Sequence, residues 1–355
     1  MIDPITLHAS TALIGPELHP ASNVRIETQE GSIVAVTADS MPEEADVRLV
    51  GITLIPGFID AHVHIGLADP REVLLGGVTT VRDLAWPPDR IFPLVLRSRS
   101  ADFDGPEVLA AGPMLTCLGG YPTRASWAPP GTARVVEDAE DGRQAARERR
   151  DEGAAIVKVA LNPAVGPTLT EEILRAICDE AHGLGLEVTG HVFGLEELDK
   201  ALDCGMDELA HMLMSPEEIP DSTMARMVEQ GMRVIPTLGI HRGKTRRRAM
   251  LNLSGFALAG GDIVYGTDLG NEGPRPGIDP TEIDRMERSE MSPEAIISSA
   301  TVRAAAAVGL SDRGVIAQGY KADLVGVKGD PIDTPVVLNQ VVFVMRAGRV
   351  HRLDV

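Results

Sequence analysis

The sequence predicts an α/β protein, a TIM-type (β/α)8 barrel with a small β-sandwich built from the N- and C-terminal segments. Two patterns predict this fold. Short apolar runs alternate with helical patterns through the middle of the chain, and period-two runs separated by turn residues occur at both ends. In addition, histidine, lysine and aspartate residues lie at the ends of apolar runs, where a barrel carries its functional groups.

The predicted sandwich domain comprises residues 1–56 and 311–355. Its period-two runs are 6–10, 24–28, 32–36, 47–50, 322–327, 341–345 and 349–351. We expect the first four runs to form a small antiparallel sheet. Because neither terminal fragment buries enough surface by itself, the two ends are expected to pair into one sandwich. His8, His19 and His351 lie in this domain, and we expect each to be structural or on the surface.

Residues 57–310 are predicted to form the barrel domain. Eight short apolar runs lie at suitable spacing: 57–65, 78–85, 107–115, 155–161, 187–193, 208–212, 233–239 and 262–268. Helical patterns lie between most of them, and one begins at a capping residue, Thr170, and ends at Gly183. Eight βα units in about 250 residues have the size of a TIM-type barrel.

Composition and charge restrict the class of protein. The chain has 355 residues, of which 44% are hydrophobic and 24% charged, which suits a protein with a substantial core. A formal net charge of -19 argues against nucleic acid and anionic membranes as partners, and so favours a small-molecule ligand.

The N-terminus has no signal-peptide pattern, and we expect a cytoplasmic protein. A homo-oligomer is left open. The odd number of cysteines, Cys117, Cys178 and Cys204, argues against a disulfide framework.

Two histidines end the first barrel run. Residues 56–64 read Pro-Gly-Phe-Ile-Asp-Ala-His-Val-His, which places His62 and His64 two residues apart. On an extended strand this spacing points both imidazoles to the same side, where they make half of a metal site. The alternative is a half-buried strand whose histidines form hydrogen bonds with the core.

Four further groups follow at the ends of later runs. Lys158 lies in the fourth run, His191 in the fifth, His211 ends the sixth and Asp268 ends the eighth. Each has an ordinary structural explanation, because histidines are found in cores and Gly-Thr-Asp is a common turn. Taken jointly, four histidines and an aspartate at strand ends predict a metal centre.

At these residues the chain resembles the amidohydrolase superfamily, whose first barrel strand ends in the same Pro-Gly-x-x-Asp-x-His-x-His pattern, and in particular its imidazolonepropionase-like and Xaa-Pro dipeptidase-like members. The resemblance covers nearly the whole chain. It implies two divalent ions, with zinc the first expectation. One ion would be held by His62, His64 and Asp268, and the second by His191 and His211. Other branches of the superfamily use one metal.

Lys158 needs a separate argument, because a charged ammonium group among apolar strand residues and beside metal ions is costly to bury. A neutral lysine reacts with carbon dioxide to give an anionic carbamate with two oxygen ligands. The resemblance implies that carboxylated Lys158 bridges the two ions. The alternatives are a strand lysine that reaches solvent and an anchor for a substrate carboxylate.

The function expected from these residues is metal-dependent hydrolysis of a C–N bond in an amide or cyclic amide, by a metal-activated hydroxide. Asp268 is the expected general base. The alternatives are a mononuclear deaminase or cyclic-imide hydrolase, a member of the same fold that catalyses a non-hydrolytic step, and a catalytically silent metal-binding protein.

Substrate contacts are expected from the loops that follow the strands. The loop after run 3 resembles the Gly-Gly-His or Gly-Gly-Tyr loop of the same members, so Tyr121 is a candidate donor to an oxyanion and Arg124 a candidate carboxylate ligand. The alternative is a rigid loop with a packed tyrosine. His241, as a second catalytic candidate, and Arg242 open a basic run that can also be the solvated start of a helix. Because arginine binds carboxylates bidentately, we expect a small carboxylate-bearing substrate such as an N-acyl amino acid, a dipeptide or an imidazolone propionate.

Overall fold

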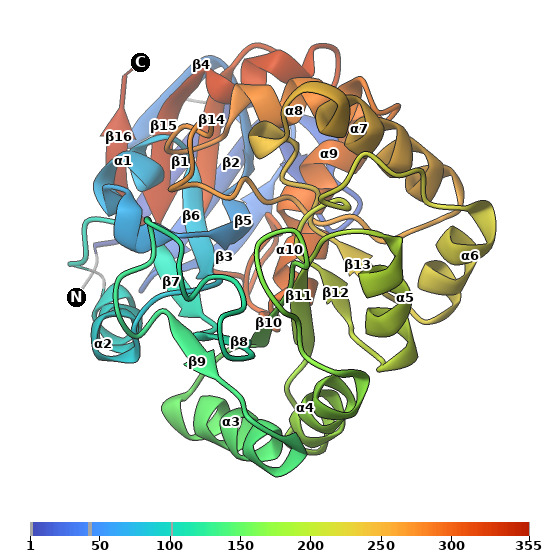
Figure 1. Ribbon diagram of the computed structural model, residues 1–355. Coiled ribbons are helices and arrows are strands. Elements are labelled where there is room, and N and C mark those ends of the chain that lie inside the picture. Colours follow the sequence, from blue (N-terminus) through green and yellow to red (C-terminus); the bar gives the residue numbers. More distant parts are fainter. Residues whose placement is uncertain (1–2, 42–44, 101, 355) are drawn as a thin grey trace.

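A seven-stranded sheet joins the two ends of the chain in the computed structural model, which describes residues 3–41, 45–100 and 102–354 (Figure 1). The strand order is β16-β15-β14-β4-β1-β2-β3. The bounds of these strands are β1 Ile5–Ile14, β2 His19–Gln29, β3 Ser32–Thr37, β4 Val47–Pro56, β14 Leu324–Lys328, β15 Val341–Arg346 and β16 Arg349–Leu353. Hydrogen bonds therefore link the N- and C-terminal segments directly, through the antiparallel pair β4 and β14.

The expectation of a purely antiparallel N-terminal sheet is wrong for one pair of strands. β1 pairs with β2 antiparallel, but it pairs with β4 in parallel, with Leu7 opposite Val47. The hairpin of β2 and β3 occupies one edge of β1, so the chain crosses over after β3 and adds β4 at the other edge. This arrangement leaves the second edge of β4 available for β14.

Eight βα units follow and form the barrel. Its strands belong to two parallel sheets, β5-β6-β7 and β13-β12-β11-β10-β8-β9. Their bounds are β5 Phe58–Val63, β6 Val78–Asp83, β7 Glu107–Ala110, β8 Met114–Thr116, β9 Ala133–Val135, β10 Val157–Leu161, β11 Val188–Val192, β12 Glu208–Leu209 and β13 Arg233–Val234. Isolated bridges from Ile263 to Val234 and from Leu269 to Val63 place the eighth run between β13 and β5.

The third predicted run is divided into two strands. β7 pairs with β6, and β8 pairs with β10, so the ring continues across an interruption at residues 111–113. Gly112 there has a φ of 74°, and Pro113 has no backbone N–H to donate to a neighbouring strand. β9 was not predicted and lies in the loop that follows β8.

Helices cover the outside of the barrel (Figure 1). Their bounds are α1 Pro70–Leu75, α2 Pro88–Ser98, α3 Ala139–Glu152, α4 Glu171–Gly183, α5 Leu195–Asp203, α6 Asp221–Glu229, α7 Gly243–Leu258, α8 Pro280–Glu287, α9 Pro293–Ala300 and α10 Val302–Ala307, with 3-10 turns η1 Ile65–Leu67, η2 Leu238–Ile240 and η3 Pro335–Asn339. Helix α4 confirms its predicted cap, because the Thr170 hydroxyl accepts from the backbone N–H of Ile173. Cys178 on α4 is buried. Over the described ranges, each helix is too short or too polar to cross a lipid bilayer.

Candidate metal centre

Six of the predicted site residues lie on or directly after barrel strands, five of them at the carboxyl ends and Lys158 at the second residue of its strand. They are His62 on β5, His64 directly after β5, Lys158 on β10, His191 on β11, His211 after β12, and Asp268 in the eighth run. Each is at most 5% exposed, so their polar atoms are shielded from bulk water. So many buried polar side chains in one place require an explanation, because buried polar atoms normally have hydrogen-bond partners.

The imidazoles converge on one carboxylate. Asp268 Oδ1 lies 3.3 Å from Nε2 of His62 and 3.2 Å from Nε2 of His64. The His211 ring lies 4.6 Å from the His62 ring and 4.8 Å from the His191 ring, measured between centroids. Each of His62, His211 and Asp268 offers a ligand atom, and these atoms all lie within 4.8 Å of one another. This spacing allows one ion to contact several of them at once.

Contacts on the far side of two rings set their orientation. Nδ1 of His62 lies 2.6 Å from the carbonyl oxygen of Ala210, which can only accept, so Nδ1 carries the proton and the Nε2 lone pair is available. Nδ1 of His211 lies 2.8 Å from the hydroxyl of Thr237. The strand ends thus hold the rings in defined positions before any ligand binds.

Burial keeps three of the imidazoles neutral at physiological pH. It lowers the pKa of His62 to about 4 and that of His191 to about 3, and it lowers the pKa of His211 well below its ordinary value. Burial also acts on His64, but hydrogen bonding and the charge of Asp268 outweigh it and raise the pKa. A neutral imidazole has the lone pair that a metal ion requires.

Lys158 is fully buried, and its Nζ has no hydrogen-bond partner among the residues that the structure describes. Burial lowers its pKa to about 7, although the charges of Asp268 and Glu208 act in the opposite direction. Glu208 itself forms an ion pair of 2.6 Å with Arg82. A large fraction of Lys158 is therefore the neutral, nucleophilic amine at neutral pH.

Asp268 supplies the negative charge of the cluster. Burial raises its pKa, but the neighbouring His62, His64 and His211 outweigh burial and hold the pKa well below its usual value. Neutral imidazoles, an ionised carboxylate and an amine without a partner together fit the donor set of a divalent metal centre.

The backbone is strained at two positions in this region. Asp268 has a φ of 60° and Thr237 a φ of 42°, both in the left-handed region that residues with a Cβ rarely adopt. The backbone N–H of Asp268 donates to the carbonyl oxygen of His62 at 2.8 Å, which ties the strained residue to β5. Such conformations cluster at functional sites.

Three neighbouring side chains lie against the imidazoles, and only one of them, Tyr121, was assigned to the site from the sequence. The indole of Trp127 lies 4.7 Å from the His64 ring, and the Asn162 side-chain nitrogen lies 3.0 Å from Nε2 of His191. Tyr121, a predicted site residue, stacks on His191 at 4.7 Å. The tyrosine hydroxyl accepts from the indole N–H of Trp127 at 3.1 Å. Asn162 directly follows β10, and this position in the sequence could have indicated that its side chain contacts the cluster.

The other predicted substrate residues are in different surroundings. Arg124 is exposed and lines a pocket of about 240 Å³ together with Tyr121. His241 is buried, which lowers its pKa to about 4, and neither ring nitrogen has a hydrogen-bond partner in the described part of the chain. The Arg242 guanidinium donates to the carbonyl oxygens of Gly239 and Glu272, each at 2.6 Å. Arg242 thus links η2 to the loop after the eighth strand.

Helix α8 holds η2 in place. The two carboxylate oxygens of Glu282 accept from the backbone N–H groups of Leu238 and Gly239, at 2.8 and 2.7 Å. Arg285 donates to the carbonyl oxygen of Leu238. The N-terminal residue of the turn, Thr237, provides no side-chain cap, so Glu282 satisfies donors that would otherwise be buried without a partner.

Comparisons with known proteins agree with this architecture. Residues 53–352 match the model of the amidohydrolase family. Ochratoxinase from Aspergillus niger is 24% identical, over 84% of this chain and 75% of the relative, and enamidase from Eubacterium barkeri is 25% identical, over 88% and 81%. The crystal structure of a Xaa-Pro dipeptidase with bound methionine superposes with a TM-score of 0.83 at 21% identity, over 99% of this chain and 100% of that one.

The family match covers most of the chain, including every candidate metal ligand, and the likeness to solved structures extends over both the barrel and the seven-stranded sheet. The expected TIM-type barrel with an added β-domain is confirmed. The chain belongs to the amidohydrolase family and is a hydrolase.

Proposed function

We propose that this hydrolase cleaves the C–N bond of a small carboxylate-bearing amide or cyclic amide, with two divalent ions held by its buried cluster. The observation that carries the proposal is the buried cluster of four imidazoles and an ionised Asp268 at the carboxyl ends of the barrel strands, with the buried amine of Lys158 acting on it from within β10. Family membership supports a metal-dependent hydrolase of C–N bonds. Zinc is the first expectation, because histidine and carboxylate are its usual ligands.

The proposed distribution of ligands is the one that the resemblance to the family implies. His62, His64 and Asp268 would hold one ion, and His191 and His211 the second. The neutral amine of Lys158 would attack carbon dioxide, form an N–C bond and lose a proton, which gives a carbamate that bridges the ions. Support comes from the buried Nζ without a partner and from the coupling of its charge to all four histidines.

The bound ions would act as Lewis acids toward the scissile carbonyl and lower the pKa of a water molecule. Asp268 would accept the proton of the attacking water and deliver it to the leaving nitrogen. Burial raises the pKa of Tyr121 to about 12, so its hydroxyl keeps its proton at neutral pH and can donate to an oxyanion. His241, neutral and with unpartnered ring nitrogens, is the second candidate base.

Metal analysis tests the centre. Protein loaded with zinc and bicarbonate should contain close to two ions per chain, because six ligating groups exceed the four that a single tetrahedral ion takes. A content that stays near one ion would exclude the binuclear centre and favour the mononuclear alternative.

Substitution of the base is a separate test. Asp268→Asn should keep the fold and lower kcat by roughly 10²- to 10⁴-fold, because an amide cannot accept the proton. His241→Ala, which removes the second candidate base, is measured beside it. Normal turnover in Asp268→Asn, with a loss in His241→Ala, would transfer the role of base to His241.

The proposed substrate class depends on Arg124, which lines the pocket beside Tyr121. Methionine in the Xaa-Pro dipeptidase structure and N-methylphosphonate-L-proline in a prolidase structure are both small molecules with a carboxylate, which supports this class. N-acyl amino acids and dipeptides should be cleaved better than their methyl esters. Arg124→Gln should remove this preference, whereas Arg150→Gln, an exposed arginine on α3, should keep it. Equal kcat/KM for acids and esters in the wild type would contradict the proposal.

A further inference from the structure

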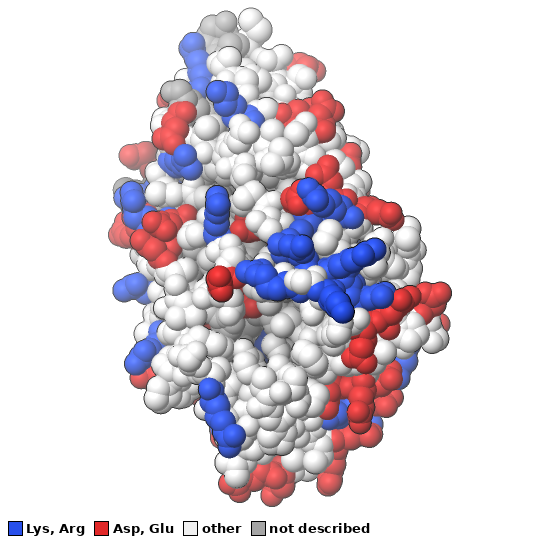
Figure 2. All heavy atoms as spheres, turned by 45° about the horizontal axis from the view of Figure 1, so that its top comes forward, with Lys and Arg blue, Asp and Glu red and all other residues white. Residues whose placement is uncertain are grey.

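A second pocket lies between α7 and α8, in the outer layer of helices. Its volume is about 680 Å³, within the usual range for a small-molecule site. The lining includes four arginines, Arg246, Arg247, Arg285 and Arg288, against one aspartate and one glutamate. Figure 2 shows Lys and Arg side chains gathered near the centre of one face of this acidic protein.

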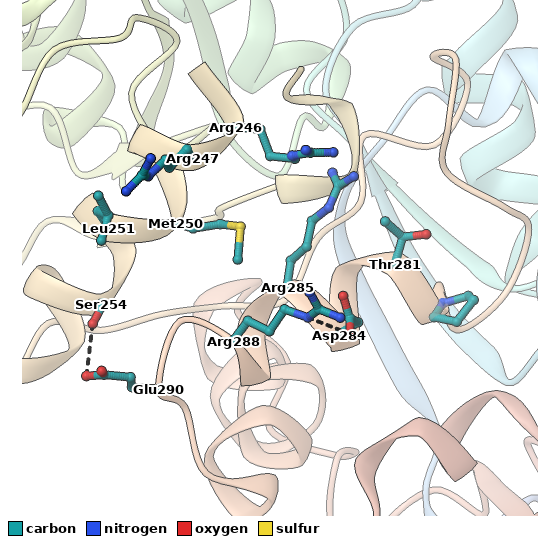
Figure 3. A pocket seen from close by; sticks show the side chains of 11 residues that line it. Arg246, Arg247, Met250, Leu251, Ser254, Thr281, Asp284, Arg285, Arg288 and Glu290 are labelled. Carbon is teal, nitrogen blue, oxygen red and sulfur yellow. Dashed lines mark hydrogen bonds and ion pairs between the residues drawn. The ribbon is translucent and has the colours of Figure 1, made fainter. Parts of the chain in front are cut away.

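The two acidic residues of the pocket are already engaged by other groups. Asp284 accepts from Nε of Arg288 at 2.9 Å, and Glu290 accepts from the hydroxyl of Ser254 at 3.1 Å (Figure 3). Within the described ranges, neither forms an ion pair with Arg285. Among the described residues, no carboxylate forms an ion pair with Arg246 or Arg247.

Two of the arginines approach each other from different helices. Figure 3 shows the guanidinium groups of Arg246, on α7, and Arg285, on α8, pointing toward one another. Burial lowers the pKa of Arg285, the charge of Glu282 acts in the opposite direction, and the like charges of Arg246 and Arg242 lower the pKa further. The carbonyl oxygen of Leu238 accepts a hydrogen bond from one N–H of Arg285 and so fixes the arginine side chain. The other N–H groups of this guanidinium remain for a ligand. An anion between the two guanidinium groups would remove the repulsion.

We propose that this pocket binds a small organic anion that carries a phosphate or two neighbouring carboxylates on a short apolar group. Converging guanidinium groups hold such anions by paired N–H···O bonds. The side chains of Met250, Leu251 and Pro280, which also line the pocket, provide contacts for the apolar part. The site is distinct from the metal cluster, and the proposal does not depend on the proposed function.

Calorimetry on the metal-loaded enzyme tests the site with two anions, phenyl phosphate and phthalate, and with benzyl alcohol as an uncharged probe. At least one anion should bind and benzyl alcohol should not. The double variant Arg246→Gln/Arg247→Gln should bind that anion at least roughly tenfold more weakly. Both residues are exposed, so the fold should persist. Arg150→Gln removes a comparable surface charge on α3 and should bind as the wild type does.

Thermal unfolding gives an independent measurement, because a ligand that binds the folded state raises the Tm. The anion should raise the Tm of the wild type and of Arg150→Gln, but not that of the double variant. The anion that binds more tightly and raises the Tm further shows whether the pocket recognises a phosphate or a dicarboxylate. Absence of binding in the wild type, or equal affinity in the double variant, would overturn the proposal, and neither outcome bears on catalysis at the metal centre.

Discussion

Lys158 is the residue at which the binuclear proposal is most directly tested. Lys158→Ala should lose one ion and most activity, and short carboxylic acids should restore part of both by supplying the missing oxygen ligands. Lys158→Arg should not be rescued, because its guanidinium is a permanent cation that fills the same space. Zinc analysis and turnover are the measurements. Wild-type metal content in Lys158→Ala would show that the lysine is not a ligand.

The lowered pKa of Lys158 also predicts a pH dependence for its carboxylation. The protonated amine does not react with carbon dioxide, so with a pKa of about 7 the reactive fraction increases as the pH rises through 7 and falls below it. In metal-free protein at constant carbon dioxide pressure, the ¹³C carbamate signal should therefore be present at neutral pH and fall steeply below pH 7, where protonation of the amine adds to the effect of the proton that carbamate formation releases. Lys158→Ala provides the background. A steep fall that already begins below the ordinary lysine pKa, about 10.4, would mean that burial does not lower the pKa.

The sequence predicted which residues form the cluster better than what holds them. Strand ends of a parallel barrel meet at one face, so the positions of His62, His64, His191, His211 and Asp268 in their runs already implied convergence. Their supporting contacts could not be predicted. The carbonyl that orients His62 comes from a residue 148 positions away, and such a contact depends on how the ring closes.

At the scale of elements, the contact between α8 and η2 makes a prediction about stability. Glu282→Ala leaves the N–H groups of Leu238 and Gly239 without acceptors, which should cost about 1–3 kcal/mol for each buried donor. Urea unfolding measures the loss. Glu287→Ala, an exposed position on the same helix, is the control and should change the free energy of unfolding by less than about 0.5 kcal/mol. Equal stability of the two variants would mean that η2 finds other acceptors.

The predicted elements were correct in order, and they differ from the structure in length. The seventh run, 233–239, contains a strand of two residues followed by η2, because Pro236 and the left-handed Thr237 turn the chain away from the ladder. The break in the third run could have been found in the sequence, since Gly112 and Pro113 are both unfavourable within a strand. Strand β9 could not, because three residues of half-buried loop carry no periodic pattern.

At the scale of the molecule, we propose that residues 1–56 and 311–355 form one domain that does not fold apart from the barrel. β4 continues almost directly into β5, and the N–H of Gly57 donates to the carbonyl oxygen of Asp323 at 2.8 Å. A single buried cluster contains Phe58 and Val78 of the barrel together with Val325 and Val344 of the sheet. The two parts therefore share a core.

A fragment of residues 57–310 should accordingly fail to fold, because the surface that β4 and β14 cover would be exposed. Solubility and circular dichroism are the measurements. Co-expression of residues 1–310 with residues 311–355 is the control and should recover soluble protein, since antiparallel β4 and β14 can pair between two chains. A soluble 57–310 fragment that unfolds cooperatively would contradict the shared core.

The left-handed backbone of Asp268 and Thr237 sets local backbone strain against the side chains that the proposed site requires. A glycine at either position would relieve strain of order 1–3 kcal/mol, but it would also delete a proposed metal ligand or the hydroxyl that contacts His211. We expect directed evolution with a screen for turnover to reject both substitutions, because the relief of strain does not replace either side chain.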